Sequence, residues 1–344
     1  MSTVEFSWGH LISKLLGGES LTEQESSAAM VEIMEGAATP AQIAGFVVAL
    51  RAKGETVDEV AGLVRTMRSY ARSVTVSGEL LDTCGTGGDR TGTFNVSTAA
   101  AIVCAGAGVK VAKHGNRAAS SRCGSADVLE ALGVVIDLPP EGVAACIDKT
   151  GIGFCFAPVF HPAMRHAGAT RRELGVATIF NFLGPLTNPA GAKRQALGVA
   201  DERMIDKMVA TLGRMGSTRV LAFHGHQGLD ELATSGPSKV VELRDGDVHR
   251  WTIDPAELGL APATLDEVSG GTAEENAAHI RTVLEGAPGP RRDIVTLNAA
   301  AGLVAAGEAD DMAAGLQRAA DAIDSGAAAR TLDLLAETSR SLAP

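Results

Sequence analysis

Residues 82–89 read DTCGTGGD, and residues 93–98 read TFNVST before an alanine-rich stretch begins. We expect a strand to end at Leu81, so that a strand, a glycine loop and a helix follow one another. Glycines let the backbone approach an anion, while free N–H groups and the helix dipole stabilise its negative charge. Ser97 and Thr98 add hydroxyl donors at the start of the helix. The stretch therefore predicts a phosphate-binding loop, with a bare tight turn as the alternative.

Two common nucleotide-binding fingerprints do not fit this loop. Arg90 stands where the dinucleotide pattern requires its third glycine. A Walker loop needs a glycine followed by a lysine and a hydroxyl residue, and no such sequence follows here. The loop therefore predicts a phosphate site outside these two families.

Around this loop, from about residue 74, short β-rich runs alternate with alanine-rich stretches. The alternation predicts an α/β unit with a mostly parallel central sheet. Further strands are expected at residues 109–111, 134–138, 153–156, 196–199 and 220–223, then a hairpin of 240–243 with 248–253, and helices from about Thr272.

The first seventy residues predict a different, all-helical unit. Thr22, Thr39 and Thr56 are each followed three residues later by Glu or Gln, which is the capping-box signature of a helix start. Pro40 takes the first helical position, where its missing N–H costs nothing. Apolar residues then recur at helical spacing, for example over residues 60–67. The fold class is thus α/β, with a small N-terminal all-helical domain joined to a larger α/β domain.

The composition limits the classes of function. Hydrophobic residues make up 45% and charged residues 21% of the chain, as in globular proteins with a sizeable core. No apolar run approaches the roughly 20 residues of a membrane span, and no signal-peptide pattern is visible, so we expect a cytoplasmic protein with no membrane partner. The net charge of −11 argues against a nucleic-acid partner, but an anionic small substrate can still bind where basic residues cluster locally.

The five cysteines are widely spaced and include no Cys-x-x-Cys pair. Neither a zinc ribbon nor a disulfide framework is therefore indicated. We expect small buried side chains, and Cys84 is of interest because it begins the glycine loop.

A second stretch, residues 113–127, reads KHGNRAASSRCGSAD and follows the strand expected at 109–111. It combines cations, an amide and several hydroxyls in a short span. A polyphosphate requires such point charges and donors, whereas a plain surface loop does not. The stretch predicts a second part of the same phosphate site.

A third stretch contains three arginines on an expected helix. Helical spacing places Arg165 and Arg172 near one face and Arg171 on another. One arginine here could bind a carboxylate through two parallel hydrogen bonds. A solvated charged helix face is the alternative.

The fourth stretch, residues 224–231, reads HGHQGLDE. Asp230 and Glu231 are adjacent hard ligands, which suit a Mg²⁺ ion shared with substrate phosphates. A pair of acids at a helix start is the alternative. His224 and His226 raise the possibility of zinc, but no third ligand has suitable spacing.

Together these stretches resemble the anthranilate phosphoribosyltransferase family. The motifs GTGGD at 85–89, NVST at 95–98, KHGNR at 113–117 and GLDE at 228–231 occur in the order and approximate spacing of that family. The resemblance covers most of the chain, from the N-terminal helices to LNAAA at residues 297–301. Pyrimidine nucleoside phosphorylases share the fold and a similar glycine and lysine pattern. The stretch from TIFN at 178–181 to Asn188 and Pro189, together with the acid pair, favours the anthranilate enzyme.

The resemblance implies a helical dimerisation domain of residues 1–73 with a piece near 165–190. This domain would be hinged to an α/β phosphoribosyltransferase domain of residues 74–344, and the chain would form a homodimer. The implied reaction transfers phosphoribose from phosphoribosyl pyrophosphate (PRPP) to the amine of anthranilate, the second step of tryptophan biosynthesis from chorismate. Two Mg²⁺ ions per monomer are implied.

The resemblance also implies site residues. Anthranilate would contact Gly85, Asn116 and Arg171, and Ser97, Asp230 and Glu231 would bind metal. The residues implied for PRPP are Gly85, Gly88, Asp89, Thr93, Asn95, Val96, Ser97, Thr98, Lys113, His114, Gly115, Asn116, Arg117, Ala118, Ala119, Ser120, Ser121 and Ser125.

No catalytic side chain is assigned, because an aniline-type amine needs no proton removed before it attacks. His114 is the possible base. Two rival functions are a pyrimidine nucleoside phosphorylase, which uses inorganic phosphate without Mg²⁺, and a non-catalytic nucleotide or polyphosphate sensor on the same scaffold.

Overall fold

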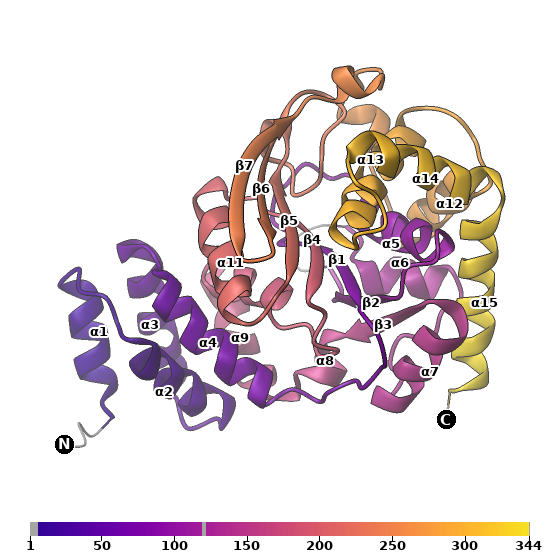
Figure 1. Cartoon of the computed structure of the whole chain (residues 1–344). Helices are drawn as coiled ribbons and strands as arrows, with labels where there is room; N and C mark the ends of the chain where they lie inside the picture. The colour runs from indigo at the N-terminus through magenta and orange to yellow at the C-terminus, as the bar shows by residue number, and fades with distance from the viewer. Residues whose placement is uncertain (1–5, 119–121, 344) are drawn as a thin grey trace.

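The computed structural model describes residues 6–118 and 122–343, and it joins a group of N-terminal helices to a larger α/β part (Figure 1). The N-terminal helices are α1 (Trp8–Leu16), α2 (Glu23–Met34), α3 (Pro40–Lys53) and α4 (Val57–Ser69). The Thr22, Thr39 and Thr56 side chains each accept from the backbone N–H three residues on, which completes the expected capping boxes.

The α/β part is built on a sheet of order β3-β2-β1-β4-β5-β6-β7. In this sheet order, adjacent strands from β3 through β2, β1 and β4 to β5 are parallel. β6 runs antiparallel to β5, and β7 runs antiparallel to β6. The strands are β1 (Leu81–Gly85), β2 (Val111–Gly115), β3 (Ile152–Phe156), β4 (Arg194–Gly198), β5 (Arg219–His224), β6 (Ser238–Arg244) and β7 (Asp247–Ile253). The structure confirms the expected mostly parallel sheet and the expected hairpin, which lies at one edge of that sheet.

Three strand predictions need correction. β1 begins at Leu81, where we expected it to end, and β2 begins at Val111, where the expected strand ended. Several polar residues assigned to loops therefore lie inside strands. Residues 134–138 form no strand in the described structure: their side chains are alternately buried, but the Val135 N–H donates to Ser339 Oγ on the C-terminal helix rather than to a neighbouring strand.

Helices cover both faces of the sheet (Figure 1). One apolar core joins the sheet to α5, α6, α7, α12, α13, α14 and α15, and a second joins it to α11 and the N-terminal helices. The remaining helices are α5 (Val96–Gly106), α6 (Ser125–Ala131), α7 (Pro140–Thr150), α8 (Ala157–Phe160), α9 (Arg165–Leu174), α10 (Phe180–Leu183), α11 (Glu202–Arg214), α12 (Ala273–Leu284), α13 (Pro290–Ala305), α14 (Met312–Asp324) and α15 (Ala327–Ser341).

The segment after β3 returns to the N-terminal helices. α9 packs against α3 and α2, and α10 contacts α4. The five cysteine side chains are buried, as expected for small apolar groups. Within the residues described, no helix is long and apolar enough to cross a bilayer.

Candidate functional site

The candidate site lies where the strand order of the sheet reverses. β1 pairs with β2 on one side and with β4 on the other, so the β1–β2 and β4–β5 connections run in opposite directions. In open α/β sheets, ligands bind outside the carboxyl ends of the strands at such a switch point. The glycine loop follows β1 at this edge, and the second and fourth stretches follow β2 and β5 there.

The acid pair is tied to the glycine loop by backbone hydrogen bonds. Asp230 Oδ2 accepts from the Gly87 N–H at 2.6 Å, and Glu231 Oε1 accepts from the Ser97 N–H at 3.1 Å. Ser97 lies in the first turn of α5, where the N–H groups have no partner within the helix. The structure thus brings Ser97, Asp230 and Glu231 together, which are the three residues predicted to bind metal.

Two glycines make room for this contact. A Cβ built on Gly85 would lie 2.2 Å from Asp230 Oδ2, and one built on Gly198 would lie 1.6 Å from the Asp230 carbonyl oxygen. Gly85 was predicted as a site residue, but Gly198, at the end of β4, was not. The available signal was a glycine inside a predicted strand, which often marks a close backbone approach.

Asn298, on α13, fixes the backbone directly after the acid pair. Its side chain accepts from the Leu232 N–H at 2.8 Å and donates to the Leu232 carbonyl at 2.9 Å. Leu232 directly follows Glu231, so both polar backbone groups next to the acid are fixed by one amide. The sequence motif LNAAA, which contains Asn298, predicted no role for this side chain.

The electrostatics of the pair indicate excess negative charge. Burial, together with the nearby Asp89, raises the pKa of Asp230 to about 7. Burial also raises the pKa of Glu231 well above its usual value, with Asp230 adding to the effect and Lys113 opposing it. Two adjacent carboxyl groups that resist ionisation are stabilised as carboxylates by a nearby cation.

Magnesium fits this donor set. Two carboxylates and a hydroxyl are hard oxygen ligands, and Mg²⁺ typically keeps several waters and shares substrate phosphates. Within the described residues, no group of three or more His, Cys, Asp or Glu could hold a metal alone. His224 Nδ1 lies 2.7 Å from the Val199 carbonyl and His226 is exposed, so these histidines offer no zinc site there.

Lys113 lies inside β2, beside the start of α5. Its Nζ donates to the Thr83 carbonyl at 2.6 Å and to Ser97 Oγ at 3.4 Å. Burial lowers the pKa of Lys113, while Asp82 and Cys84 act in the opposite direction. The ammonium is therefore held at the same edge of the sheet as the helix N-terminus, where a polyphosphate would meet both.

Acidic side chains of α6 contact the loop after β2. Asn116 and Arg117 are exposed, and Arg117 pairs with Asp127 at 2.8 Å and Glu130 at 2.5 Å. Its guanidinium therefore already has two carboxylate partners. The Asn116 carbonyl accepts from Ser125 Oγ at 3.3 Å, and Gly115 packs against the same hydroxyl.

Ala118 also points its backbone towards an acid, with its N–H donating to Asp127 Oδ2 at 3.1 Å. Ala119, Ser120 and Ser121, all predicted for PRPP, lie outside the described residues.

Asn95 links the glycine loop to two other segments. Its side chain donates to the Cys123 carbonyl at 3.2 Å and accepts from Asn276 Nδ2 at 2.9 Å. Asn276, on α12, also accepts from the Gly271 N–H at 2.7 Å. No sequence signal marks Asn276, because its role depends on contacts across 181 residues of chain.

The remaining residues of this loop contribute in separate ways. Val96 and Thr98 are buried in the first turn of α5, and Thr98 Oγ1 has no hydrogen-bond partner in the described structure. Gly88 has a φ of 82°, which favours glycine, and Asp89 accepts from Thr91 Oγ1 at 2.6 Å. Thr93 pairs with Ser269 across an isolated bridge.

His114 is poorly suited to be a base. Burial lowers its pKa to about 3, and the neighbouring His161 adds to the effect. Its Nδ1 lies 3.0 Å from the Gly184 carbonyl. A general base works best with a pKa near the operating pH, so His114 would accept a proton only weakly.

Arg171 is separate from the glycine loop. Its guanidinium lies 5.4 Å from the ring centre of Phe180 and is half-buried. In the described part of the chain, Arg171 forms no ion pair and no hydrogen bond to Gly85 or Asn116. Arg165 and Arg172 are exposed, so the predicted difference between their helix face and that of Arg171 is visible.

Comparisons with known proteins agree with this arrangement. Residues 9–71 match the helical bundle domain of a glycosyl transferase family, and residues 77–329 match its a/b domain. Curated proteins named anthranilate phosphoribosyltransferase from Arthrobacter sp. (strain FB24) and Moorella thermoacetica are 57% and 54% identical. The alignments cover 95% and 94% of this chain, and 94% and 96% of those proteins.

Solved structures give the same result. A crystal structure of anthranilate phosphoribosyltransferase from Thermus thermophilus matches with a TM-score of 0.91 and 47% identity, over 96% of this chain and 99% of that one. The Saccharomyces cerevisiae enzyme in complex with PRPP and Mg matches with a TM-score of 0.89 and 26% identity, over 98% and 99%.

Proposed function

We propose that this chain, which belongs to the anthranilate phosphoribosyltransferase family, makes N-(5-phosphoribosyl)anthranilate and pyrophosphate from PRPP and anthranilate. The reaction is the second step of tryptophan biosynthesis from chorismate. The proposal rests on two hydrogen bonds at the switch point of the sheet: the Gly87 N–H donates to Asp230, and the Ser97 N–H donates to Glu231. The yeast relative with PRPP and Mg has the same fold.

In this proposal, PRPP lies along Gly85–Asp89, residues 93–98, residues 113–121 and Ser125. The bond from the anomeric carbon to pyrophosphate breaks, the anthranilate nitrogen forms a bond to the same carbon, and the nitrogen then loses one proton to solvent. The backbone donors of the glycine loop and of α5, with the Lys113 ammonium, are positioned before the reaction to bind the leaving polyanion. Such preorganised donors stabilise the charge that develops as the bond breaks.

Ser97, Asp230 and Glu231 would hold Mg²⁺, and we propose two ions per monomer. When bound, Mg²⁺ supplies positive charge that neutralises the leaving pyrophosphate. The raised pKa values of both acids support this assignment, because a cation at this position would stabilise them as carboxylates.

Anthranilate would be held by its carboxylate on Arg171, with Asn116 and Gly85 on the side of PRPP. The Arg171 guanidinium, stacked on Phe180 and without an ion pair in the described structure, is suited to this task. The neutral amine attacks with its own lone pair, so the chain's main contribution is to align the two substrates. We assign no side-chain base, and the lowered pKa of His114 supports this.

We propose a homodimer formed through a helical domain of residues 1–73 and about 165–190, with residues 74–344 as the catalytic domain. Leu16 on α1 and Val48 on α3 are large apolar side chains that are 75% and 44% exposed, and a dimer contact would bury such groups. Sedimentation of the purified chain tests this, and a monomer at all concentrations would contradict it. The cytoplasmic location also stays a prediction from the sequence.

The decisive experiment follows anthranilate fluorescence in the presence of purified protein, PRPP and Mg²⁺. We expect the signal to fall only when PRPP and Mg²⁺ are both present, and EDTA to stop the change. No loss of signal in folded protein that still binds PRPP would contradict the proposal and favour a sensor. Phosphorolysis of thymidine or uridine with inorganic phosphate would instead identify a nucleoside phosphorylase.

A further inference from the structure

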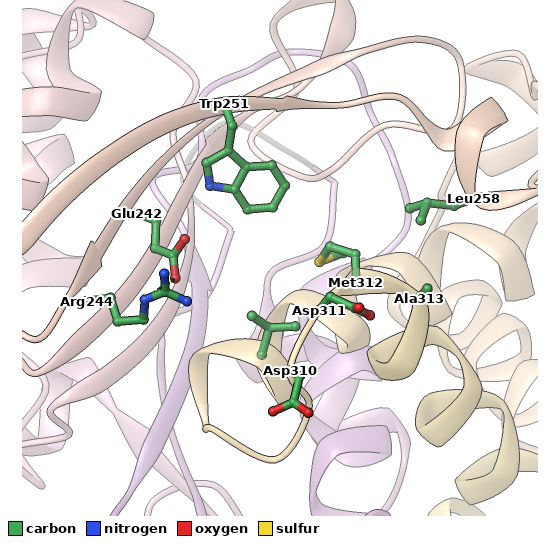
Figure 2. Close-up of a pocket in the computed structure, with 9 residues that line it drawn as sticks. Glu242, Arg244, Trp251, Leu258, Asp310, Asp311, Met312 and Ala313 are labelled. Carbon is green, nitrogen blue, oxygen red and sulfur yellow. Dashed lines mark ion pairs between the residues drawn. The ribbon is translucent and has the colours of Figure 1, made fainter.

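A hollow of about 330 Å³ lies between the β6–β7 hairpin and the turn that joins α13 to α14 (Figure 2). Arg244, one of its lining residues, pairs with Arg219 at the start of β5. The hollow therefore lies at the amino ends of the parallel strands. The glycine loop and the acid pair lie at the opposite, carboxyl edge, so this is a separate feature.

The walls of the hollow are largely apolar. Trp251 projects from β7 towards Met312, with Leu258 and Val304 completing the wall (Figure 2). Val304 and Met312 belong to the buried core, whereas Trp251 and Leu258 are only partly buried. The volume is at the lower end of the roughly 300–1,000 Å³ typical of small-molecule sites.

Glu242 is a buried charged residue in this largely apolar wall. It occupies an inward-facing position of β6, and only 6% of the residue is exposed. Its one ion pair, with Arg244, spans 3.8 Å, and no hydrogen bond reaches its side chain in the described structure. No described residue donates a hydrogen bond to the Glu242 carboxylate, so a hydrogen-bond donor that enters the hollow can bind it.

The charges around the hollow are also unbalanced. Glu242, Asp310 and Asp311 bring three carboxylates, and Arg244 is the one cation among the nine lining residues. Asp311 Oδ1 accepts from the Ala314 N–H at 2.8 Å as the cap of α14, while Asp310 is exposed. The lining residues themselves carry net negative charge, which favours a positively charged ligand, while Arg194 and Arg219 lie against Gly307 in the same turn, outside the lining.

We propose that this hollow binds a small organic cation with an apolar body, such as a primary arylalkylamine. The ammonium would donate to Glu242, which supplies the missing hydrogen bonds. The apolar body would pack against Trp251 and Met312, and the indole face adds a cation–π attraction if the ammonium approaches it.

Three matched ligands test the proposal on the full-length protein by calorimetry: 2-phenylethylamine, 2-phenylethanol and phenylacetate. They share a phenyl group and differ in charge. We expect the amine to bind about 10-fold to 100-fold more tightly than the alcohol, since a hydrogen bond to a charged group is stronger, and the anion to bind least. Equal affinities for amine and alcohol, or no amine binding up to about 10 mM, would overturn the proposal.

Variants locate the site. Glu242→Gln keeps the shape of the side chain and should remove the preference for the amine, while Asp310→Asn should weaken it less. Amine binding that is unchanged in Glu242→Gln, or that saturating PRPP and Mg²⁺ displace, would place the amine elsewhere and overturn the proposal. If Glu242→Gln does not fold, the comparison of the three ligands on the unmodified chain still decides.

Discussion

At the carboxyl edge of the sheet, backbone N–H groups hold Asp230 and Glu231, whereas the Arg171 guanidinium on α9 stacks over the ring of Phe180. The first region is built from loops of one sheet, so its geometry depends on close backbone contacts. The second region offers one side chain from a helix that packs on α2 and α3. Substitutions in the first region should therefore slow the whole reaction, whereas substitutions in the second should weaken the binding of one substrate.

The two regions also differ in charge. The edge concentrates carboxyl groups whose pKa values are raised, and the helix presents a cation without an ion pair in the described structure. A metal–pyrophosphate complex complements the first and a carboxylate complements the second. Each of the following predictions tests whether the two regions are independent.

The largest effect is expected from Gly198→Ala. The new Cβ would overlap the Asp230 carbonyl, a backbone atom that cannot move without displacing the acid pair. Overpacking of this kind costs about 1–3 kcal/mol or more, and a shift of about 1 Å near reacting groups costs about 100-fold in rate. We expect kcat to fall by more than about 100-fold, measured in the fluorescence assay with a thermal unfolding curve beside it.

The matched control is Gly168→Ala on α9. There the Cβ would meet only Arg172 Nη1 at 3.6 Å, and alanine favours a helix. A fully active Gly198→Ala protein, or an equal loss in both variants, would remove the difference between the regions.

The next effect is that of Asp230→Asn combined with Glu231→Gln. Shapes are kept but both negative charges are lost, so Mg²⁺ should bind more weakly. We expect kcat to fall about 100-fold and the Mg²⁺ concentration for half-maximal rate to rise. Asp247→Asn, an exposed acid at the β6–β7 turn, is the control. An unchanged Mg²⁺ dependence would place the metal elsewhere.

The parts of the site that the sequence predicted are those with local signals. The capping boxes need only four consecutive residues, and the acid pair and the glycine loop are recognised by residue type. Asn276 was missed because its role depends on a partner 181 residues away in the chain, and Gly198 was missed although a glycine inside a predicted strand was a signal for it.

The errors in the strands have a related cause. Asp82 and Lys113 are polar residues inside buried strands, so the apolar pattern placed the strand boundaries too early. Residues 134–138 have the alternation of a strand but make a backbone contact to a helix, which no local pattern can distinguish.

A smaller and more selective effect is expected from Arg171→Ala. Removing a charge-assisted hydrogen bond should raise the KM for anthranilate by about 10-fold to 100-fold. The KM for PRPP should stay within about 2-fold, because the glycine loop is untouched. Arg172→Ala, the exposed neighbour, is the control and should change neither. An equal rise in both KM values would show that α9 and the sheet edge act as one unit.

The smallest effect concerns the two histidines where the regions meet. His114 on β2 and His161 before α9 have ring centres 5.1 Å apart, and burial lowers their pKa values to about 3 and about 4. In the unfolded chain both would take up protons below about pH 6.5. Between that pH and about 4 the unfolded state binds more protons, so the free energy of unfolding falls as the pH falls.

Each histidine contributes at most about 1.4 kcal/mol per pH unit to this slope. Urea unfolding of the chain between pH 7 and 5 gives the slope, and His161→Phe keeps the ring while removing one titrating group. The acid pair acts with the opposite sign in this range, because its raised pKa values make the folded state bind more protons. The difference between the chain and His161→Phe cancels that contribution. A slope unchanged by the substitution would mean that His161 takes up its proton in the folded state too, so that the contact between the two regions opens readily.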